Sequence, residues 1–132
     1  MTARLAFHAA YHAALSQKIS ALMTPFAISI HSFTPHPLTG DLRDVEIGLL
    51  VKHDPRSAER FLTAAQSANT PYDMRVNEPY SAYELNYTVD RHLGADIPHL
   101  NIEVRQDLIA TDQTARDMAD HLAPIIAAVV DG

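Results

Sequence analysis

Histidine, amide, carboxylate and arginine side chains follow the apolar runs of this sequence at the points where strands would end. His31 closes one run, Asn77 and Glu78 follow another, and Glu103 and Arg105 lie near the end of a third. Ligands of open α/β sheets collect beyond the carboxyl ends of the strands, so these side chains are expected to meet in one cleft. Imidazole and carboxylate can hold zinc, a second carboxylate can take a proton from the bound water, and a guanidinium can bind an acidic substrate. The pattern therefore favours metal-assisted hydrolysis.

The composition restricts the class of protein. With 132 residues, 47% of them hydrophobic and 20% charged, the chain has the composition of one globular domain spanning residues 1–132. A net charge of -6 disfavours nucleic acid and anionic membranes as partners. The absence of cysteine leaves only His, Asp and Glu as metal ligands. Because no apolar run approaches the roughly 20 residues of a membrane-spanning helix and the first residues lack a secretion signal, we expect a cytoplasmic protein.

Apolar periodicity predicts the elements that must position these side chains. Helices are expected over residues 4–23, from 55 onward, from 81 toward 94, and from about 111 onward; strands are expected over 26–31, 45–52, 72–76 and 99–105. The order contains no repeat and no linker, which predicts an α/β fold with a mixed central sheet flanked by helices. Ser81 and Glu84 have capping-box spacing, and Pro124 is expected to kink or interrupt the last helix.

Two groups of residues allow a structural as well as a functional interpretation. Glu103 and Arg105 share one face of the strand over 99–105 and could form a surface ion pair of little energetic value. We favour function, because Asn101 and His99 extend the same polar face, which would be costly to bury for stability alone. His8 and His12 have a spacing that can chelate a metal, but they share a stripe with apolar residues, which favours packing.

Four ordered stretches resemble the motifs of the N-formylglutamate amidohydrolase family. They read HSFTP at 31–35, NEPYS at 77–81, YTVDRH at 87–92 and IEVRQDL at 102–108, and the similarity extends to YHAAL at 11–15 and HDPR at 53–56. The resemblance covers nearly the whole chain. It implies a zinc-dependent hydrolase, similar in fold to the zinc carboxypeptidases and phosphorylase/hydrolase-like proteins, that cleaves the formyl amide of N-formylglutamate or a related small acidic N-acyl amino acid.

The resemblance also implies a role for each matching residue. His31 would be a metal ligand, and Glu103 would be the general base beside the metal-bound water. The residues that would bind substrate or line the cleft are Asn77, Glu78, Arg91, His92 and Arg105.

Members of this family are longer, and their additional segment precedes the part that matches here and carries a first metal-ligand motif. The chain therefore resembles the carboxyl-terminal part of such an enzyme. Since a catalytic zinc normally has three protein ligands, a noncatalytic remnant that binds a small acidic ligand or a partner subunit stays an alternative. So does a metal site completed between chains by His8 or His12 of a neighbour. Without the leading segment, an exposed sheet edge or apolar surface is expected, and hence a homo-oligomer.

Overall fold

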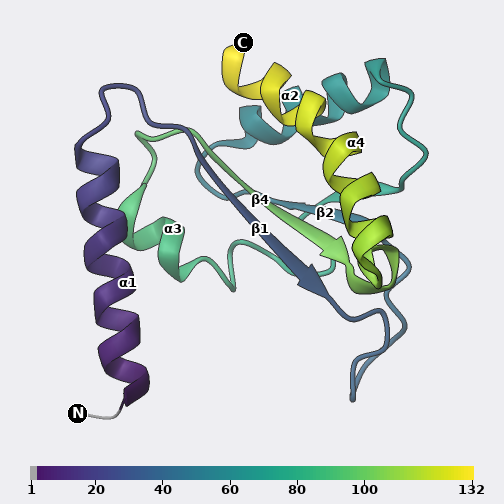
Figure 1. Cartoon of the computed structure of the whole chain (residues 1–132), viewed down its shortest axis with the longest axis horizontal. Coiled ribbons are helices and arrows are strands. Elements are labelled where there is room, and N and C mark those ends of the chain that lie inside the picture. Colours follow the sequence, from purple (N-terminus) through teal and green to yellow (C-terminus); the bar gives the residue numbers. More distant parts are fainter. Residues whose placement is uncertain (1–2) are drawn as a thin grey trace.

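The computed structural model describes residues 3–132, which form a sheet with helices on both sides (Figure 1). The order of helices and strands is the one that the sequence predicts, with one short 3-10 helix added after the last strand. The elements are α1 (Ala3–Ser20), β1 (Ala27–Phe33), β2 (Ile47–Leu50), α2 (Pro55–Ser67), β3 (Met74–Val76), α3 (Tyr87–His92), β4 (His99–Arg105), the 3-10 helix Gln106–Ile109 and α4 (Asp112–Asp131). No helix in this part of the chain is long and apolar enough to cross a bilayer.

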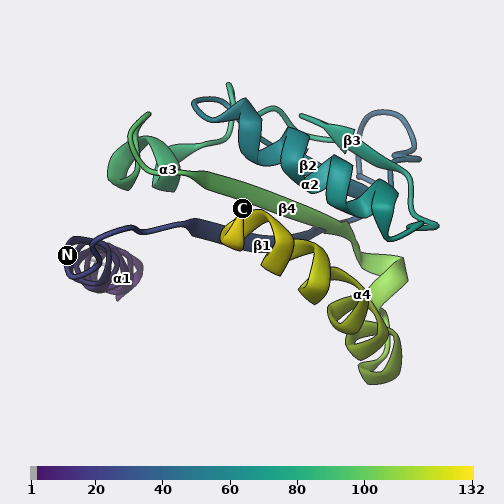
Figure 2. The ribbon, with the colours of Figure 1, turned by 90° about the horizontal axis from the view of Figure 1, so that it is seen from above.

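The sheet is mixed, as predicted, and its strand order is β1-β4-β2-β3. β1 runs parallel to β4 and β3 runs parallel to β2, whereas β2 and β4 are antiparallel. The register of β1 on β4 places His31 directly beside Glu103. β1 has no partner strand on its outer side within residues 3–132. α1 lies beside α3, far from α4 (Figures 1 and 2).

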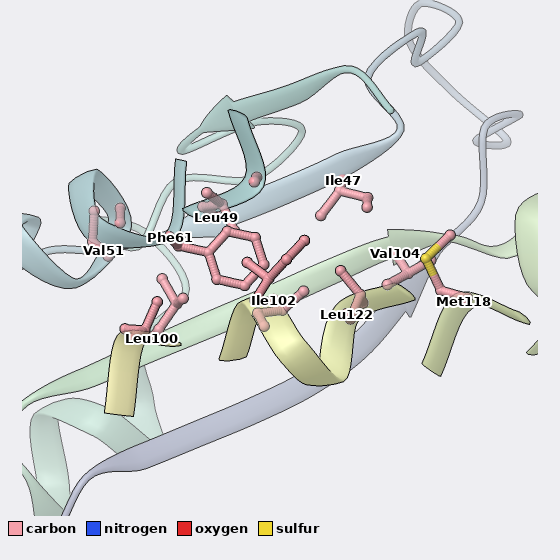
Figure 3. Close-up of a cluster of buried hydrophobic side chains, with 13 residues drawn as sticks. Ile47, Leu49, Val51, Phe61, Leu100, Ile102, Val104, Met118 and Leu122 are labelled. Atoms are coloured by element: carbon pink, nitrogen blue, oxygen red, sulfur yellow. The ribbon is translucent and has the colours of Figure 1, made fainter. Parts of the chain in front are cut away.

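The hydrophobic core lies between the sheet and the helices α2 and α4 (Figure 3). Leu100, Ile102 and Val104 of β4 face this core, because alternate residues of a strand point to opposite faces. The polar residues between them therefore face the other side of the sheet. The predicted inward residues of α4 are all buried: Met118, Leu122, Ile125 and Val129.

The helix expected from Ser81 is shorter than predicted and begins at Tyr87, after Asn86. The backbone at Ser81 makes a single turn, in which its carbonyl accepts from the amides of Glu84 and Leu85. The Ser81 hydroxyl accepts from the amide of Tyr83, whereas a capping box needs it to accept from the amide of Glu84. The capping-box assignment at Ser81 is therefore wrong.

The interruption expected at Pro124 is absent, and α4 is assigned without a break. Pro124 is solvent-exposed, while Leu122 and Ile125 on the opposite side of the helix are buried in the core. Core packing on that side holds the helix together although proline supplies no backbone donor. α4 begins instead with a capping box between Thr111 and Thr114.

The predicted first helix is confirmed, but its apolar stripe is only partly buried. His12 is buried, Leu15 and Ile19 are half-buried, and Leu5 is mostly exposed. α1 contacts the rest of the protein mainly through α3, so most of its surface faces solvent.

Candidate active site

A cavity of about 370 Å³ lies on the polar face of β1 and β4, on the side of the sheet away from the main core. Ser29 and His31 of β1 line it together with Asn101 and Glu103 of β4. Its volume falls within the range of small-molecule sites. Residues of α1 and α3 form the opposite wall, so the cavity lies between four elements that are distant in sequence.

His31 and Glu103 occupy neighbouring positions in the parallel β1–β4 pair and line the same cavity. The two predicted residues therefore open into a shared hollow and are not separated by packed core. Glu103 is only 9% exposed, and burial raises the pKa of its carboxyl group, while the adjacent His31 offsets part of this effect. A carboxylate with a raised pKa in a cavity suits a group that accepts and returns a proton.

A hydrogen-bonded series of polar side chains forms the floor of the cavity. The Ser29 hydroxyl donates to Oδ1 of Asn101, and Nδ2 of Asn101 donates to Oδ1 of Asn86 at 3.2 Å. Asn86 in turn donates from Nδ2 to Oδ1 of Asp90 at 3.1 Å. The amide of Asn101 is therefore held in one orientation from both ends. Asn101 is expected from the sequence on the polar face of its strand, whereas no sequence pattern pointed to Ser29 or Asn86.

Asp90 connects this floor to the segment that follows β2. Its carboxylate lies 2.8 Å from Nε2 of His53 and accepts a hydrogen bond from Nζ of Lys52 at 3.0 Å. The hydrogen bonds from His53 and Lys52 lower the pKa of Asp90 to about 2. Asp90 thus stays ionised and holds α3 against the loop after β2.

Asn77 and Glu78 do not line the cavity. The Asn77 side chain accepts from the amides of Val51 and Ala82 at 3.1 and 3.2 Å, and it donates to the Val51 carbonyl at 3.0 Å. These bonds hold the turn that brings Tyr80 to the cavity wall. Glu78 is exposed and pairs with Arg75 at 3.1 Å. The assignment of substrate contacts to Asn77 and Glu78 stays a prediction.

The predicted arginines also lie outside the cavity lining. Arg105 pairs with Asp107 at 2.8 Å, and its Nη1 donates to the Asp44 carbonyl at 2.6 Å, in a separate surface hollow. These contacts, the Asp107 hydrogen bond above all, raise the pKa of Arg105. Arg91 donates from Nη1 to the Tyr87 hydroxyl at 2.7 Å, and Tyr87 does line the cavity. Arg91 therefore reaches the cavity only through the tyrosine.

His92 joins a cluster of three imidazoles between α1 and α3. Its ring stacks on that of His12, with 2.7 Å between Nε2 of His92 and Nδ1 of His12. Nε2 of His12 lies 3.1 Å from Nε2 of His8. Both ring nitrogens of His12 thus lie close to other imidazoles of this chain. The metal site completed between chains by His8 or His12 stays a prediction.

The arrangement of the His, Asp and Glu side chains shows whether a catalytic zinc would fit. Across residues 3–132, no three His, Asp or Glu side chains are grouped so that they could hold a metal ion. His31 and Glu103 supply two neighbouring donors, whereas a catalytic zinc normally has three protein ligands and a water. The described residues therefore do not fit a complete zinc site by themselves.

The cavity also has an apolar wall that the sequence analysis did not identify. It includes Leu15 and Ile19 of α1, and Leu85, Val89 and Leu93 from the segment around α3. The four-residue spacing of Leu15 and Ile19 indicated a common helical face, but it did not reveal that this face encloses a ligand-sized cavity.

Comparison with known proteins agrees with this architecture. The chain is similar to the crystal structure of gene product Atu2144 from Agrobacterium tumefaciens, with a TM-score of 0.81 and 29% sequence identity. The similarity covers 96% of this chain and 50% of that one, so this chain spans about half the length of the solved protein. No curated protein matches the sequence. The sequence profile of the N-formylglutamate amidohydrolase family matches residues 2–110, most of the chain. The chain therefore belongs to the N-formylglutamate amidohydrolase family.

Proposed function

We propose that this chain acts in hydrolysis of the formyl amide of an N-acylated amino acid, either N-formylglutamate or a related compound. The observation that carries the proposal is the adjacency of His31 and Glu103 in one cavity, in a chain of this family. The net negative charge of the chain disfavours nucleic acid, and the volume of the cavity suits a small-molecule ligand.

Glu103 serves as the general base. Its carboxylate takes a proton from water, the water oxygen bonds to the formyl carbon, and the proton passes to the nitrogen as the carbon–nitrogen bond breaks. Formate and a free amino acid result. General acid–base assistance of this kind contributes about 10²- to 10⁴-fold to a rate. The raised pKa of Glu103 makes the returned proton easier to hold between the two steps.

His31 is the proposed metal ligand, in keeping with the family resemblance. Zinc dependence requires at least one further ligand beside His31 and Glu103, because no three His, Asp or Glu side chains of residues 3–132 are grouped to hold a metal ion. No step is therefore assigned to zinc here.

A second candidate function is binding without catalysis, and the same donor count favours it. A chain with two neighbouring donors and a preformed cavity could retain a small acidic ligand, or a partner subunit, without hydrolysing it. Hydrolysis needs Glu103 as a base, whereas binding does not, so substitution of Glu103 separates the two functions.

Formate release from N-formyl amino acids, measured with and without added zinc, tests hydrolysis. Glu103→Gln should lower the rate by about 10²- to 10⁴-fold, because glutamine accepts no proton. The matched control is Glu59→Gln, an exposed position on α2 outside the cavity, which should keep the full rate.

The rate should rise with pH as Glu103 ionises, with a midpoint above the ordinary glutamate value of 4.5. A Glu103→Gln rate equal to that of the unmodified protein would remove Glu103 as the base. A folded protein that binds N-formyl amino acids but releases no formate, whatever the zinc concentration, would establish the binding alternative.

A further inference from the structure

The cavity has a polar reactive end and a long extension along the sheet. Ala27, Ser29 and His31 alternate along β1 on the cavity side, with Glu103 beside His31. At about 3.3 Å per strand residue, the floor runs on the order of 13 Å from His31 back to Ala27. A formyl amide at His31 and Glu103 would therefore leave the rest of its molecule to extend toward Ala27.

The floor of this extension carries the polar side chains of Ser29 and Asn101, and the walls that face it are largely apolar. Leu15 and Ile19 of α1 face the extension from one side. Val89 of α3 and Leu93, which directly follows α3, also face the extension. Leu50 and Val89 are almost fully buried, so this surface is a built part of the interior. Leu15 and Ile19 are half-buried and Leu85 is 60% exposed, so a side chain that entered here would lose part of its contact with water.

The charges around the cavity disfavour a second carboxylate in the ligand. Among the described residues, no lysine or arginine lines the cavity, and Glu103 contributes a negative charge. The γ-carboxylate of a bound glutamate would thus be desolvated without a cation to pair with, which is strongly unfavourable.

Two arginines are held at the outside of the cavity wall by tyrosines. Arg91 donates to the Tyr87 hydroxyl at 2.7 Å, and Arg43 donates to the Tyr80 hydroxyl at 2.8 Å. Both tyrosines line the cavity, so the two cations stand behind its wall. From there they can attract the α-carboxylate that every N-acyl amino acid carries.

Resting on the proposed function, we infer that this cavity selects an N-formyl amino acid with an apolar side chain, such as leucine, methionine or phenylalanine, in preference to N-formylglutamate. The formyl amide lies at His31 and Glu103, and the apolar side chain lies between Leu15, Ile19 and Leu93. The volume of about 370 Å³ accommodates a ligand of this size.

Calorimetric binding of N-formyl-leucine and N-formylglutamate to the Glu103→Gln variant tests this inference without turnover. N-formyl-leucine should bind at least about tenfold more tightly, as expected for burial of one aliphatic side chain. Leu15→Ala should weaken N-formyl-leucine about tenfold and leave N-formylglutamate nearly unchanged.

Leu15→Arg supplies the missing cation and should reverse the preference toward N-formylglutamate. The control is Leu5→Arg, which adds the same charge to an exposed position of the same helix and should leave the preference unchanged. Far-ultraviolet circular dichroism on each variant checks that the helix content is retained.

The outcomes separate this inference from the proposed hydrolysis. The inference is overturned if N-formylglutamate binds as tightly as N-formyl-leucine or more tightly, or if neither ligand binds. In either case, formate release by the unmodified protein would still support hydrolysis. Preference for N-formyl-leucine without formate release from either compound supports the apolar selectivity and removes the hydrolysis.

Discussion

Glu103 depends on a glycine in the neighbouring strand. Gly48 of β2 pairs with Glu103 across the antiparallel ladder, and a Cβ added at Gly48 would overlap the carbonyl oxygen of Glu78. The added atom would also approach the Glu103 Cβ to 3.4 Å. The absent side chain thus lets the turn after β3 pass close to the base of the cavity.

Asn77 stabilises that turn in a way that can be measured. It has a φ of 54° and makes three hydrogen bonds to the backbone of Val51 and Ala82. Asn77→Ala should lower the free energy of unfolding by about 2 to 4 kcal/mol, because the buried backbone groups lose their partners and alanine disfavours positive φ. Urea denaturation checks this value.

Asn69→Ala is the matched control, since Asn69 has a similar φ of 51° but is exposed. It should lower the free energy of unfolding by only about 1 kcal/mol, which is the cost of placing alanine at a positive φ. Equal losses for Asn69→Ala and Asn77→Ala would show that the side-chain hydrogen bonds of Asn77 do not stabilise the turn.

At the scale of elements, α1 is held mainly by its imidazole contacts with α3. His12 is buried between His8 and His92, and the Ser16 hydroxyl lies 3.1 Å from Nδ1 of His92. These contacts place Leu15 and Ile19 over the cavity. Any condition that separates α1 from α3 therefore also opens the cavity wall.

The docking of α1 should weaken in acid. Burial, and then the positive charges of His8, Arg91 and His92, lower the pKa of His12 below its ordinary value of 6.5. Below about pH 6.5 the undocked His12 binds a proton that the docked side chain resists, so docking loses stability as pH falls further. Above this pH the contribution is fully present. Hydrogen exchange of the α1 amides should therefore be faster at about pH 5.5 than at about pH 7.5, after correction for intrinsic rates.

His12→Gln should remove most of this pH dependence, because glutamine does not titrate. His36→Gln changes an exposed loop histidine and should leave it intact. If α1 exchange stayed equally pH-dependent in His12→Gln, another group would control the docking.

At the scale of the whole molecule, apolar side chains lie exposed on α1 and on the edge strand β1. Phe7 is 76% exposed and Ile30 is 60% exposed, and β1 offers free backbone groups on its outer side within the described residues. Such an edge is a template for pairing with another strand. We therefore expect the predicted homo-oligomer to form its contact through this edge.

Ile30→Lys should shift the protein toward monomer by at least about tenfold in dissociation constant, because it places a charge in the edge contact. Light scattering across a concentration series measures the shift. Leu38→Lys, at a fully exposed loop position, is the control and should leave association unchanged. A protein that is monomeric at every concentration before any substitution would contradict the expected self-association.

Much of the fold follows from local patterns in the sequence. The apolar spacing of α4 identified all four of its buried residues, and the alternation of β4 separated its core face from its polar face. Such patterns are reliable because helix and strand geometry repeat over a few residues. The order of the expected elements also predicted the mixed α/β class. The resemblance to the family came instead from the ordered motifs at 31–35, 77–81, 87–92 and 102–108.

Long-range contacts decided the rest. His31 and Glu103 were both predicted, but their adjacency depends on the pairing of β1 with β4 across most of the chain. The roles of other polar residues depend on which partner lies nearest: Asn77 binds the Val51 backbone, and Arg105 donates to the Asp44 carbonyl. No local periodicity encodes these choices, because each is the outcome of competition among hydrogen-bond partners that only folding brings together. The sequence determined which side chains were available for chemistry, and the tertiary structure decided which of them share a cavity.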